Sequence, residues 1–124
     1  MATCPARCQT RAMTSQDASD AARRAFLDER RASSARRYTE VHSEHFDDEW
    51  GEVLPTHARF VDRFVGLVPV GGAVLDAACG TGKYWPMLLA AGLAVTGIDQ
   101  STGMLAQATA KHPGVPTHRL ALPR

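Results

Sequence analysis

Two carboxylates and two glycines lie at a spacing that fits the binding of a nucleoside-like ligand. Asp76 follows a short apolar run, and Gly80 and Gly82 come shortly after it. Glycine has no Cβ, so such a loop can adopt positive φ angles and let a ligand approach the backbone. A helix beginning after the loop would add free N–H groups and the positive end of its dipole. Asp99 lies close to the offset of about 20 residues at which nucleotide-binding folds place an acid, where it would accept hydrogen bonds from both ribose hydroxyls.

Two details of the loop decide between a dinucleotide and a cationic ligand. The dinucleotide fingerprint G-x-G-x-x-G/A needs a small third residue, which lets the helix pack closely on the strand beside a pyrophosphate. Trp85 occupies that position here and would obstruct such packing. The carboxylate of Asp76 would repel a pyrophosphate, whereas it suits an ammonium group with a sulfonium beside it. These residues favour S-adenosylmethionine over a nicotinamide dinucleotide.

Two segments resemble a known family. Val74–Gly82 (VLDAACGTG) closely resembles motif I of class I S-adenosylmethionine-dependent methyltransferases, and Gly97–Leu105 (GIDQSTGML) resembles the segment that follows it. The family form D-x-x-x-G-x-G, then an acid, then S-x-x-M-L, is satisfied throughout, and the resemblance covers roughly Val53 to Leu122. It implies an α/β fold with a Rossmann-like parallel sheet and flanking helices, S-adenosylmethionine as cofactor, and methyl transfer to an acceptor.

The resemblance also implies roles for individual residues. Asp76 would lie near the methionine amino group through water, the glycine loop would pass under the methionine and ribose, and Asp99 would bind the ribose hydroxyls. Gln100 and Met104 would flank the adenine, and Tyr38 is the candidate for a tyrosine that closes over the cofactor. The expected cofactor-binding set is therefore Asp76, Ala78, Gly80, Thr81, Gly82, Asp99, Gln100, Met104 and Tyr38.

Several of these residues have an alternative interpretation. Asp76 could cap its own loop, and Met104 could be a core residue on a helix face. Cys79 is expected to be a small buried residue and not a nucleophile. No side chain presents itself as a general base, so the sequence leaves the catalytic residue unknown.

The remaining chain predicts the elements that position this loop. Residues 1–20 lack apolar periodicity and predict a disordered tail, in which Met13 is an alternative start to Met1. Residues 21–69 predict a helical segment, with helices over 21–47 and from Pro55 to about residue 68. Residues 70–124 predict part of the methyltransferase domain. A buried strand at 73–76 is followed by a helix that begins at Lys83 or Tyr84 and ends at a glycine cap, Gly92. A strand at 94–99, a helix capped by Ser101 that ends near Lys111, and the start of a strand within 115–122 complete the predicted elements.

Composition and charge argue against a membrane-spanning, secreted, nucleic-acid-binding or metal-binding protein. The 124 residues carry a net charge of +1, and no apolar run is long enough to span a bilayer or to form a signal peptide. The three cysteines do not indicate a disulfide framework, so a cytoplasmic protein is the expectation. The paired arginines of the first helix are diluted by acids, which indicates a solvated face and not a nucleic-acid arm. His42 and His45 near Asp47 lack a fixed ligand spacing, so no metal site is predicted.

The resemblance implies a sheet of about seven strands, of which this sequence predicts two or three. The strand at 73–76 would then have an open apolar edge, which invites self-association or a complementing chain. We therefore expect a fragment or truncated product of a methyltransferase that acts on a small-molecule acceptor. The alternatives left open are a non-catalytic S-adenosylmethionine-binding or dimerising module and, less favoured, a NAD(P)-dependent oxidoreductase fragment.

Overall fold

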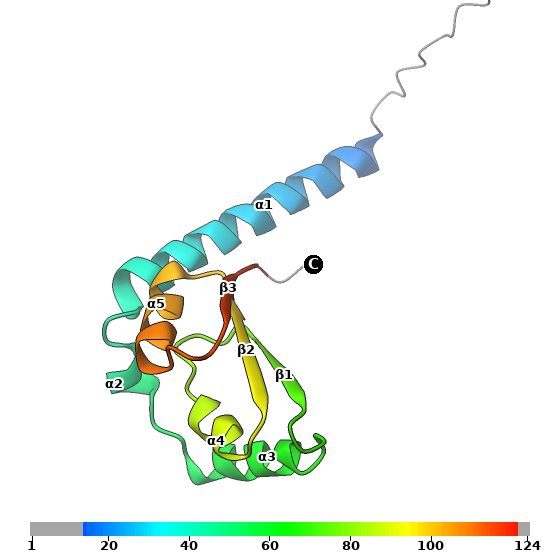
Figure 1. Cartoon of the computed structure of the whole chain (residues 1–124). Helices are drawn as coiled ribbons and strands as arrows, with labels where there is room; N and C mark the ends of the chain where they lie inside the picture. Colours follow the sequence, from blue (N-terminus) through cyan, green and yellow to red (C-terminus); the bar gives the residue numbers. More distant parts are fainter. Residues whose placement is uncertain (1–13, 122–124) are drawn as a thin grey trace, which may run out of the picture. The chain divides into compact units, whose positions relative to one another are not determined.

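The chain divides into two units after Ala32. The computed structural model describes residues 14–121, and Figure 1 labels its elements. The first unit holds most of α1 (Ser15–Arg37), a helix that buries none of its residues. The second unit, from Ser33 onward, contains the sheet and the candidate site. Within residues 14–121, no helix has the length and apolar character needed to cross a membrane.

The start of α1 corrects the expectation of a disordered tail over residues 1–20. The helix begins at Ser15, and the residues around it form a reciprocal cap. The Asp17 carboxylate accepts a hydrogen bond from the Thr14 N–H at 2.9 Å, and the Thr14 hydroxyl accepts one from the Asp17 N–H at 3.1 Å. Such a box satisfies backbone donors that a helix terminus otherwise leaves unpaired. Residues 1–13 of the expected tail lie outside the described residues.

The expected single helix over 21–47 is also wrong beyond Arg37. A π-helical turn, η1 (Tyr38–His42), replaces the regular helix, and a separate short helix, α2 (Phe46–Trp50), follows it. The hydroxyl groups of this stretch bond outside the regular helix pattern. Ser43 Oγ donates to the Thr39 carbonyl at 2.7 Å, and Thr39 Oγ1 lies 2.9 Å from Ser101 Oγ. Tertiary contacts therefore decide the backbone here, which the local pattern could not reveal.

The sheet has the predicted α/β arrangement. Its strands β1 (Ala73–Ala77), β2 (Ala94–Asp99) and β3 (Thr117–Arg119) are parallel and lie in the order β1-β2-β3 (Figure 1). The helix α4 (Trp85–Ala90) connects the first two strands, and α5 (Thr102–Lys111) connects the second and third. Because the strands are parallel, their carboxyl ends meet at one edge of the sheet, where ligands bind in folds of this kind.

The helix boundaries follow from specific capping residues. Ser101 Oγ accepts a hydrogen bond from the Met104 N–H at 3.2 Å and so caps α5 as predicted. Gly92, with φ 74°, ends α4. The Gly92 and Leu93 N–H groups return to the Leu89 and Leu88 carbonyls at 2.9 and 3.2 Å. This is the pair of bonds that defines a Schellman cap.

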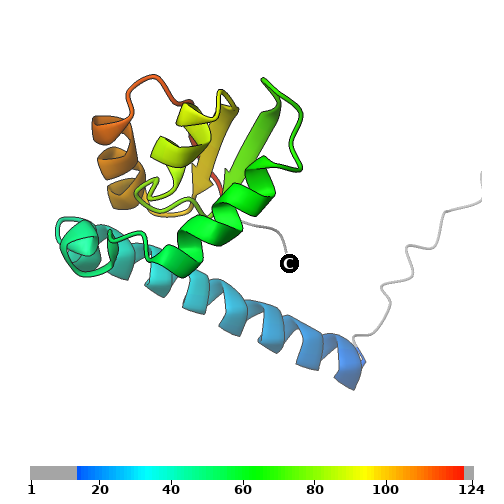
Figure 2. The ribbon, with the colours of Figure 1, turned by 90° about the horizontal axis from the view of Figure 1, so that it is seen from below.

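The core lies between the sheet and the helices α3 (Pro55–Val65), α4 and α5. Trp85 is fully buried at its centre, and α3 packs beside α4 (Figure 2). The indole ring fills the space left by two glycines, because a Cβ at Gly82 or Gly97 would come within 2.7 or 2.4 Å of its carbon atoms. The remaining buried core side chains are Cys79, Leu88, Leu93, Val95, Leu105, Ala108 and Val115.

The expectation that β1 is a buried strand is wrong for the described residues. Val74 and Asp76 are half-buried, whereas Ala73, Leu75 and Ala77 are exposed. Leu75 is 62% exposed. Among residues 14–121, β1 pairs with β2 alone, so its other edge has no partner strand there. The pattern alternates because the helices cover one face of the strand.

Candidate functional site

The loop between β1 and α4 holds the backbone of the site in an unusual shape. Ala78, Gly80 and Gly82 have φ angles of 62°, 56° and 75°. A Cβ built on Gly80 would meet no atom within 4 Å, so the space beside this residue is open to a ligand. At Gly82 the same atom would collide with the Trp85 ring, so this glycine serves packing. Ala78 adopts the left-handed conformation with a side chain, which costs about 1–2 kcal/mol and is typical of functional loops.

Asp99 ties the glycine loop to the start of α5. One carboxylate oxygen accepts from the Gly80 N–H at 2.9 Å, and the other accepts from the Ser101 N–H at 2.8 Å. A carboxylate has about four acceptor positions, so two remain for the hydroxyls of a ribose. The predicted pairing of a glycine loop with an acid at the end of the second strand is therefore a direct contact.

Asp76 faces inward and meets Trp85. Its Oδ2 accepts a hydrogen bond from the indole Nε1 at 2.8 Å, while its other oxygen keeps its acceptor capacity. Burial raises the pKa of Asp76, the bond from Trp85 opposes this, and the charge of Asp99 raises the pKa further. The indole bond is a structural role that the sequence did not predict for either residue.

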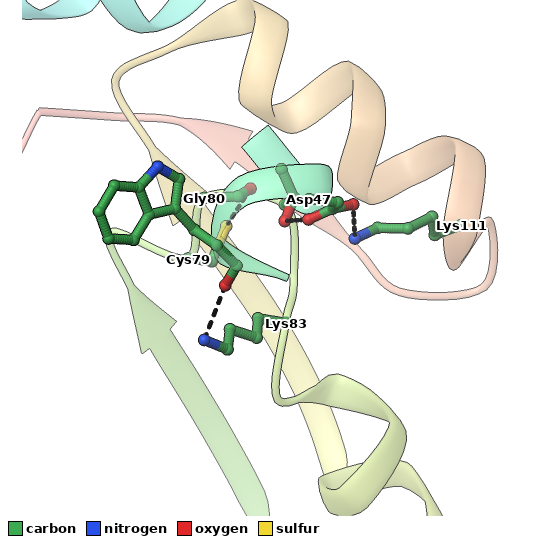
Figure 3. Close-up of polar contacts among 7 residues, drawn as sticks. Asp47, Cys79, Gly80, Lys83 and Lys111 are labelled. Atoms are coloured by element: carbon green, nitrogen blue, oxygen red, sulfur yellow. Dashed lines mark hydrogen bonds and ion pairs between the residues drawn. The ribbon is translucent and has the colours of Figure 1, made fainter. Parts of the chain in front are cut away.

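Thr81 is 1% exposed, and its hydroxyl bonds to the helical segment before motif I. Thr81 Oγ1 donates to Asp47 Oδ1 at 2.6 Å, and Lys111 Nζ donates to the other oxygen of the same carboxylate at 2.5 Å. Lys83 Nζ also reaches this segment, donating to the Trp50 carbonyl at 2.8 Å (Figure 3). The sequence pattern does not predict this role of Asp47, which arises from contacts between distant segments.

The three other predicted residues lie around the start of α5. Gln100 follows Asp99 directly, and its carbonyl accepts from Arg119 Nε at 3.4 Å. Met104 is only 2% exposed, so its side chain is enclosed by protein. Tyr38 is 41% exposed and packs its ring 5.4 Å from His42 and 6.3 Å from Phe46, measured between ring centroids. Its element η1 contacts α5, the helix that begins just after Asp99.

Cys79 lies inside the loop and is buried. Burial raises its pKa to about 12, and the charges of Asp76 and Asp99 contribute in the same direction. The thiol is therefore protonated at neutral pH and is not an activated nucleophile. No group of three or more His, Cys, Asp or Glu residues within the described chain could hold a metal ion.

An apolar pocket of about 360 Å³ opens between α3, β1 and α4. Phe60, Phe64 and Leu88 line it together with the polar side chains of His57, Asp76 and Tyr84. His57 Nδ1 is buried and has no hydrogen-bond partner in the described part of the chain. Asp76 is thus shared between this pocket and the loop, a placement that the sequence pattern does not predict.

The region around the glycine loop is similar to a known domain. A sequence model described as a methyltransferase domain matches residues 74–121, which include the loop, Asp99 and α5. Among curated proteins, no significant match was found.

Solved structures of methyltransferases match a larger part of the chain. A TehB-like SAM-dependent methyltransferase from Corynebacterium glutamicum is 28% identical, with a TM-score of 0.50, over 62% of this chain and 44% of its own. The sugar N-methyltransferase KedS8 from Streptoalloteichus is 29% identical, with a TM-score of 0.51, over 63% of this chain and 32% of its own. The magnesium protoporphyrin IX methyltransferase of Synechocystis is similar in fold, with a TM-score of 0.56 at 20% identity, over 73% of this chain and 53% of its own.

The chain therefore spans about half or less of the length of the structures it matches. Its glycine loop, the acid at the end of β2 and its parallel sheet agree with the family match over residues 74–121. Residues 74–121 of this chain are therefore similar to a methyltransferase domain, and the sheet with its flanking helices has the Rossmann-like fold of S-adenosylmethionine-dependent methyltransferases.

Proposed function

We propose that this chain binds S-adenosylmethionine at the loop between β1 and α4 and serves the transfer of its methyl group to a small-molecule acceptor. The observation that carries the proposal is the contact between Asp99 and the Gly80 N–H. It places a carboxylate with spare acceptor positions beside the open space at Gly80. Ribose hydroxyls would donate to Asp99, and the missing side chain of Gly80 would let the ligand lie against the backbone.

The other residues of the expected set would surround the same ligand. The free oxygen of Asp76 suits the methionine ammonium group, directly or through water. Gln100 and Met104 at the start of α5 would flank the adenine, and Tyr38 on η1 would cover it. Because Met104 is enclosed, its contribution would be apolar contact from the floor of the site.

The bound cofactor supplies an activated methyl group on a sulfonium, which is already an excellent leaving group. The protein then contributes mainly by aligning the acceptor and excluding water. A small acceptor is supported by the likeness to a sugar N-methyltransferase at 29% identity. A general base is needed only for some acceptors.

The alternatives have less support. Trp85 occupies the position where a dinucleotide-binding fold needs a small residue. Its indole donates a hydrogen bond to Asp76 and packs against Gly82 and Gly97, which hold the ring in this position. Nothing in the comparisons favours an oxidoreductase. A non-catalytic binding module would use the same loop, so the binding experiment below applies to it as well.

Titration calorimetry with S-adenosylhomocysteine tests the proposal. We expect binding by the full chain and a loss of about 1–3 kcal/mol in the Asp99→Asn variant, which removes a charged acceptor while keeping the side-chain size. Asp62→Asn, on the exposed face of α3, is the control and should bind like the wild type. Binding of NADH in place of S-adenosylhomocysteine would contradict the proposal and revive the oxidoreductase alternative.

A further inference from the structure

The segment 38–50 before motif I is attached to the cofactor loop and to α5 at separate points. At one point, Thr39 Oγ1 lies 2.9 Å from Ser101 Oγ at the start of α5. The Gly103 N–H approaches the same Thr39 oxygen at 3.5 Å, and a Cβ at Gly103 would collide with Ser43. This point fixes η1 beside the residues proposed to bind adenine.

The second attachment is made by Asp47 on α2. Its carboxylate joins two elements that are far apart in sequence, since one oxygen accepts from Thr81 in the glycine loop and the other from Lys111 at the end of α5. Figure 3 shows Asp47 and Lys111 facing each other across this junction. Thr81 is 1% exposed, so water cannot replace Asp47 as its acceptor without a rearrangement.

The glycine loop is consequently held by two carboxylates. Asp99 holds the Gly80 N–H from the end of β2, and Asp47 holds the next side chain, that of Thr81, from the helical segment. Lys83 adds a third contact, from the far end of the loop to the Trp50 carbonyl. A change in the conformation of the loop on ligand binding would therefore alter the conformation of segment 38–50, and a change in that segment would alter the loop.

We propose that Asp47 is a positioning residue which, through Thr81 and Lys111, fixes the glycine loop for the cofactor and couples cofactor binding to the conformational stability of the segment 38–50. This inference rests on the proposed function, because it takes the glycine loop as the binding site. Allosteric coupling of this kind is typically worth a 5- to 150-fold change in affinity, by the general range of such couplings, and works in both directions.

Hydrogen exchange of the full chain, with and without S-adenosylhomocysteine, tests the coupling. The variants are Asp47→Ala and Thr81→Val, with Thr81→Ser restoring the hydroxyl. Asp48→Ala is the matched control, because it makes the same change one position along α2 at a side chain that is 81% exposed. Urea unfolding of each variant shows that it is folded.

The proposal expects three results. In the unliganded Asp47→Ala and Thr81→Val variants, amides of residues 79–82 exchange faster than in the wild type or Asp48→Ala. Their affinity for S-adenosylhomocysteine falls by about 5-fold or more, and Thr81→Ser recovers it. Ligand slows exchange in residues 38–50 of the wild type, and this protection is lost in Asp47→Ala although the loop itself is still protected.

Two different failures are distinguishable. If the wild type shows no ligand-dependent protection, the proposed function is contradicted, while faster loop exchange in unliganded Asp47→Ala would still support the positioning role. If Asp47→Ala behaves like Asp48→Ala in loop exchange, affinity and protection of residues 38–50, the role of Asp47 is overturned whatever the wild type binds.

Discussion

Trp85 shows how one buried side chain can position the residues of a candidate site. Its indole is fully buried, occupies the space left by Gly82 and Gly97, and donates a hydrogen bond to Asp76. The sequence pattern predicts that Trp85 is incompatible with dinucleotide packing. What the pattern could not show is that Trp85 holds one of the predicted cofactor-binding carboxylates in place.

Replacing Trp85 by Phe removes the indole donor and part of the ring volume. Asp76 then loses its hydrogen-bond partner in a buried setting, so we expect a loss of about 1–3 kcal/mol in the free energy of unfolding. Urea unfolding measures it. Trp50→Phe is the control, since Trp50 is exposed and, within residues 14–121, its indole bonds to the neighbouring Glu49 alone. Equal stability of the two variants would show that the buried indole bond contributes nothing.

The charge of Asp47 predicts a pH dependence of stability. Partial burial opposes its ionisation, but the hydrogen bonds from Lys111 and Thr81 and the charges of Lys111 and Lys83 outweigh this and lower its pKa below 3.8. A carboxyl group with a lowered folded-state pKa stabilises the fold above its unfolded value, and this contribution is lost as pH falls through the folded value.

Asp47→Ala should therefore be less stable than the wild type near neutral pH, by a modest amount of about 0.5–1 kcal/mol because the side chain is partly exposed. The difference should shrink as urea unfolding is repeated at successively lower pH through the lowered folded-state pKa of Asp47, below which both states of the wild type bind the proton. A difference that stays constant across this range would mean that the charge of Asp47 is not what stabilises the junction.

At the scale of elements, different glycines of the loop between β1 and α4 serve core packing and the proposed ligand binding. Gly82 is needed because Trp85 lies against it, whereas Gly80 faces open space. Both have positive φ, as does Gly92 at the end of α4, which also has nothing within 4 Å of a built Cβ. Gly80 and Gly92 therefore both adopt a positive φ angle and both have room for a Cβ atom, but only Gly80 lies in the candidate site.

Gly80→Ala and Gly92→Ala should lose a similar amount of stability, about 1–2 kcal/mol for a side chain in the left-handed conformation. Only Gly80→Ala should also weaken S-adenosylhomocysteine binding, by about tenfold or more, because its methyl group would occupy the ligand's space. Calorimetry and urea unfolding on the same preparations measure both quantities. Undiminished binding by Gly80→Ala would show that no ligand lies against this residue.

The elements were predictable where local signals set them. The glycine turn, the strand ending at Asp99, the Ser101 cap and the Gly92 cap all follow from short-range pattern, and the structure confirms them. The break after Arg37 was missed because contacts with α5 cause it. Asp47 was missed for the same reason, since no sequence spacing indicates that α2 meets both Thr81 and Lys111.

At the scale of the whole molecule, the exposed side of β1 is the main departure from a typical parallel sheet. Such sheets are usually covered on both faces, and unpaired strand edges act as templates for another strand. Here β1 pairs with β2 alone among residues 14–121, and Leu75 projects an exposed apolar side chain beside that edge. We therefore predict that a second copy of the chain pairs along this edge.

Leu75→Lys should reduce self-association, because a charge on an edge strand opposes pairing. Sedimentation velocity over a range of concentrations is the measurement. Leu67→Lys is the matched control, since Leu67 is 79% exposed but lies in the turn after α3, away from the sheet. A chain that is monomeric throughout, or that responds equally to both changes, would rule out association through this edge.

The most direct test of the account is to locate S-adenosylhomocysteine on the chain by chemical-shift mapping of the backbone amides. The account predicts saturable shifts confined to residues 76–82 and 99–104, with smaller ones in segment 38–50 and none along the exposed face of α3. Shifts centred instead on the apolar pocket between α3, β1 and α4, or no saturable shifts from a folded chain, would contradict it.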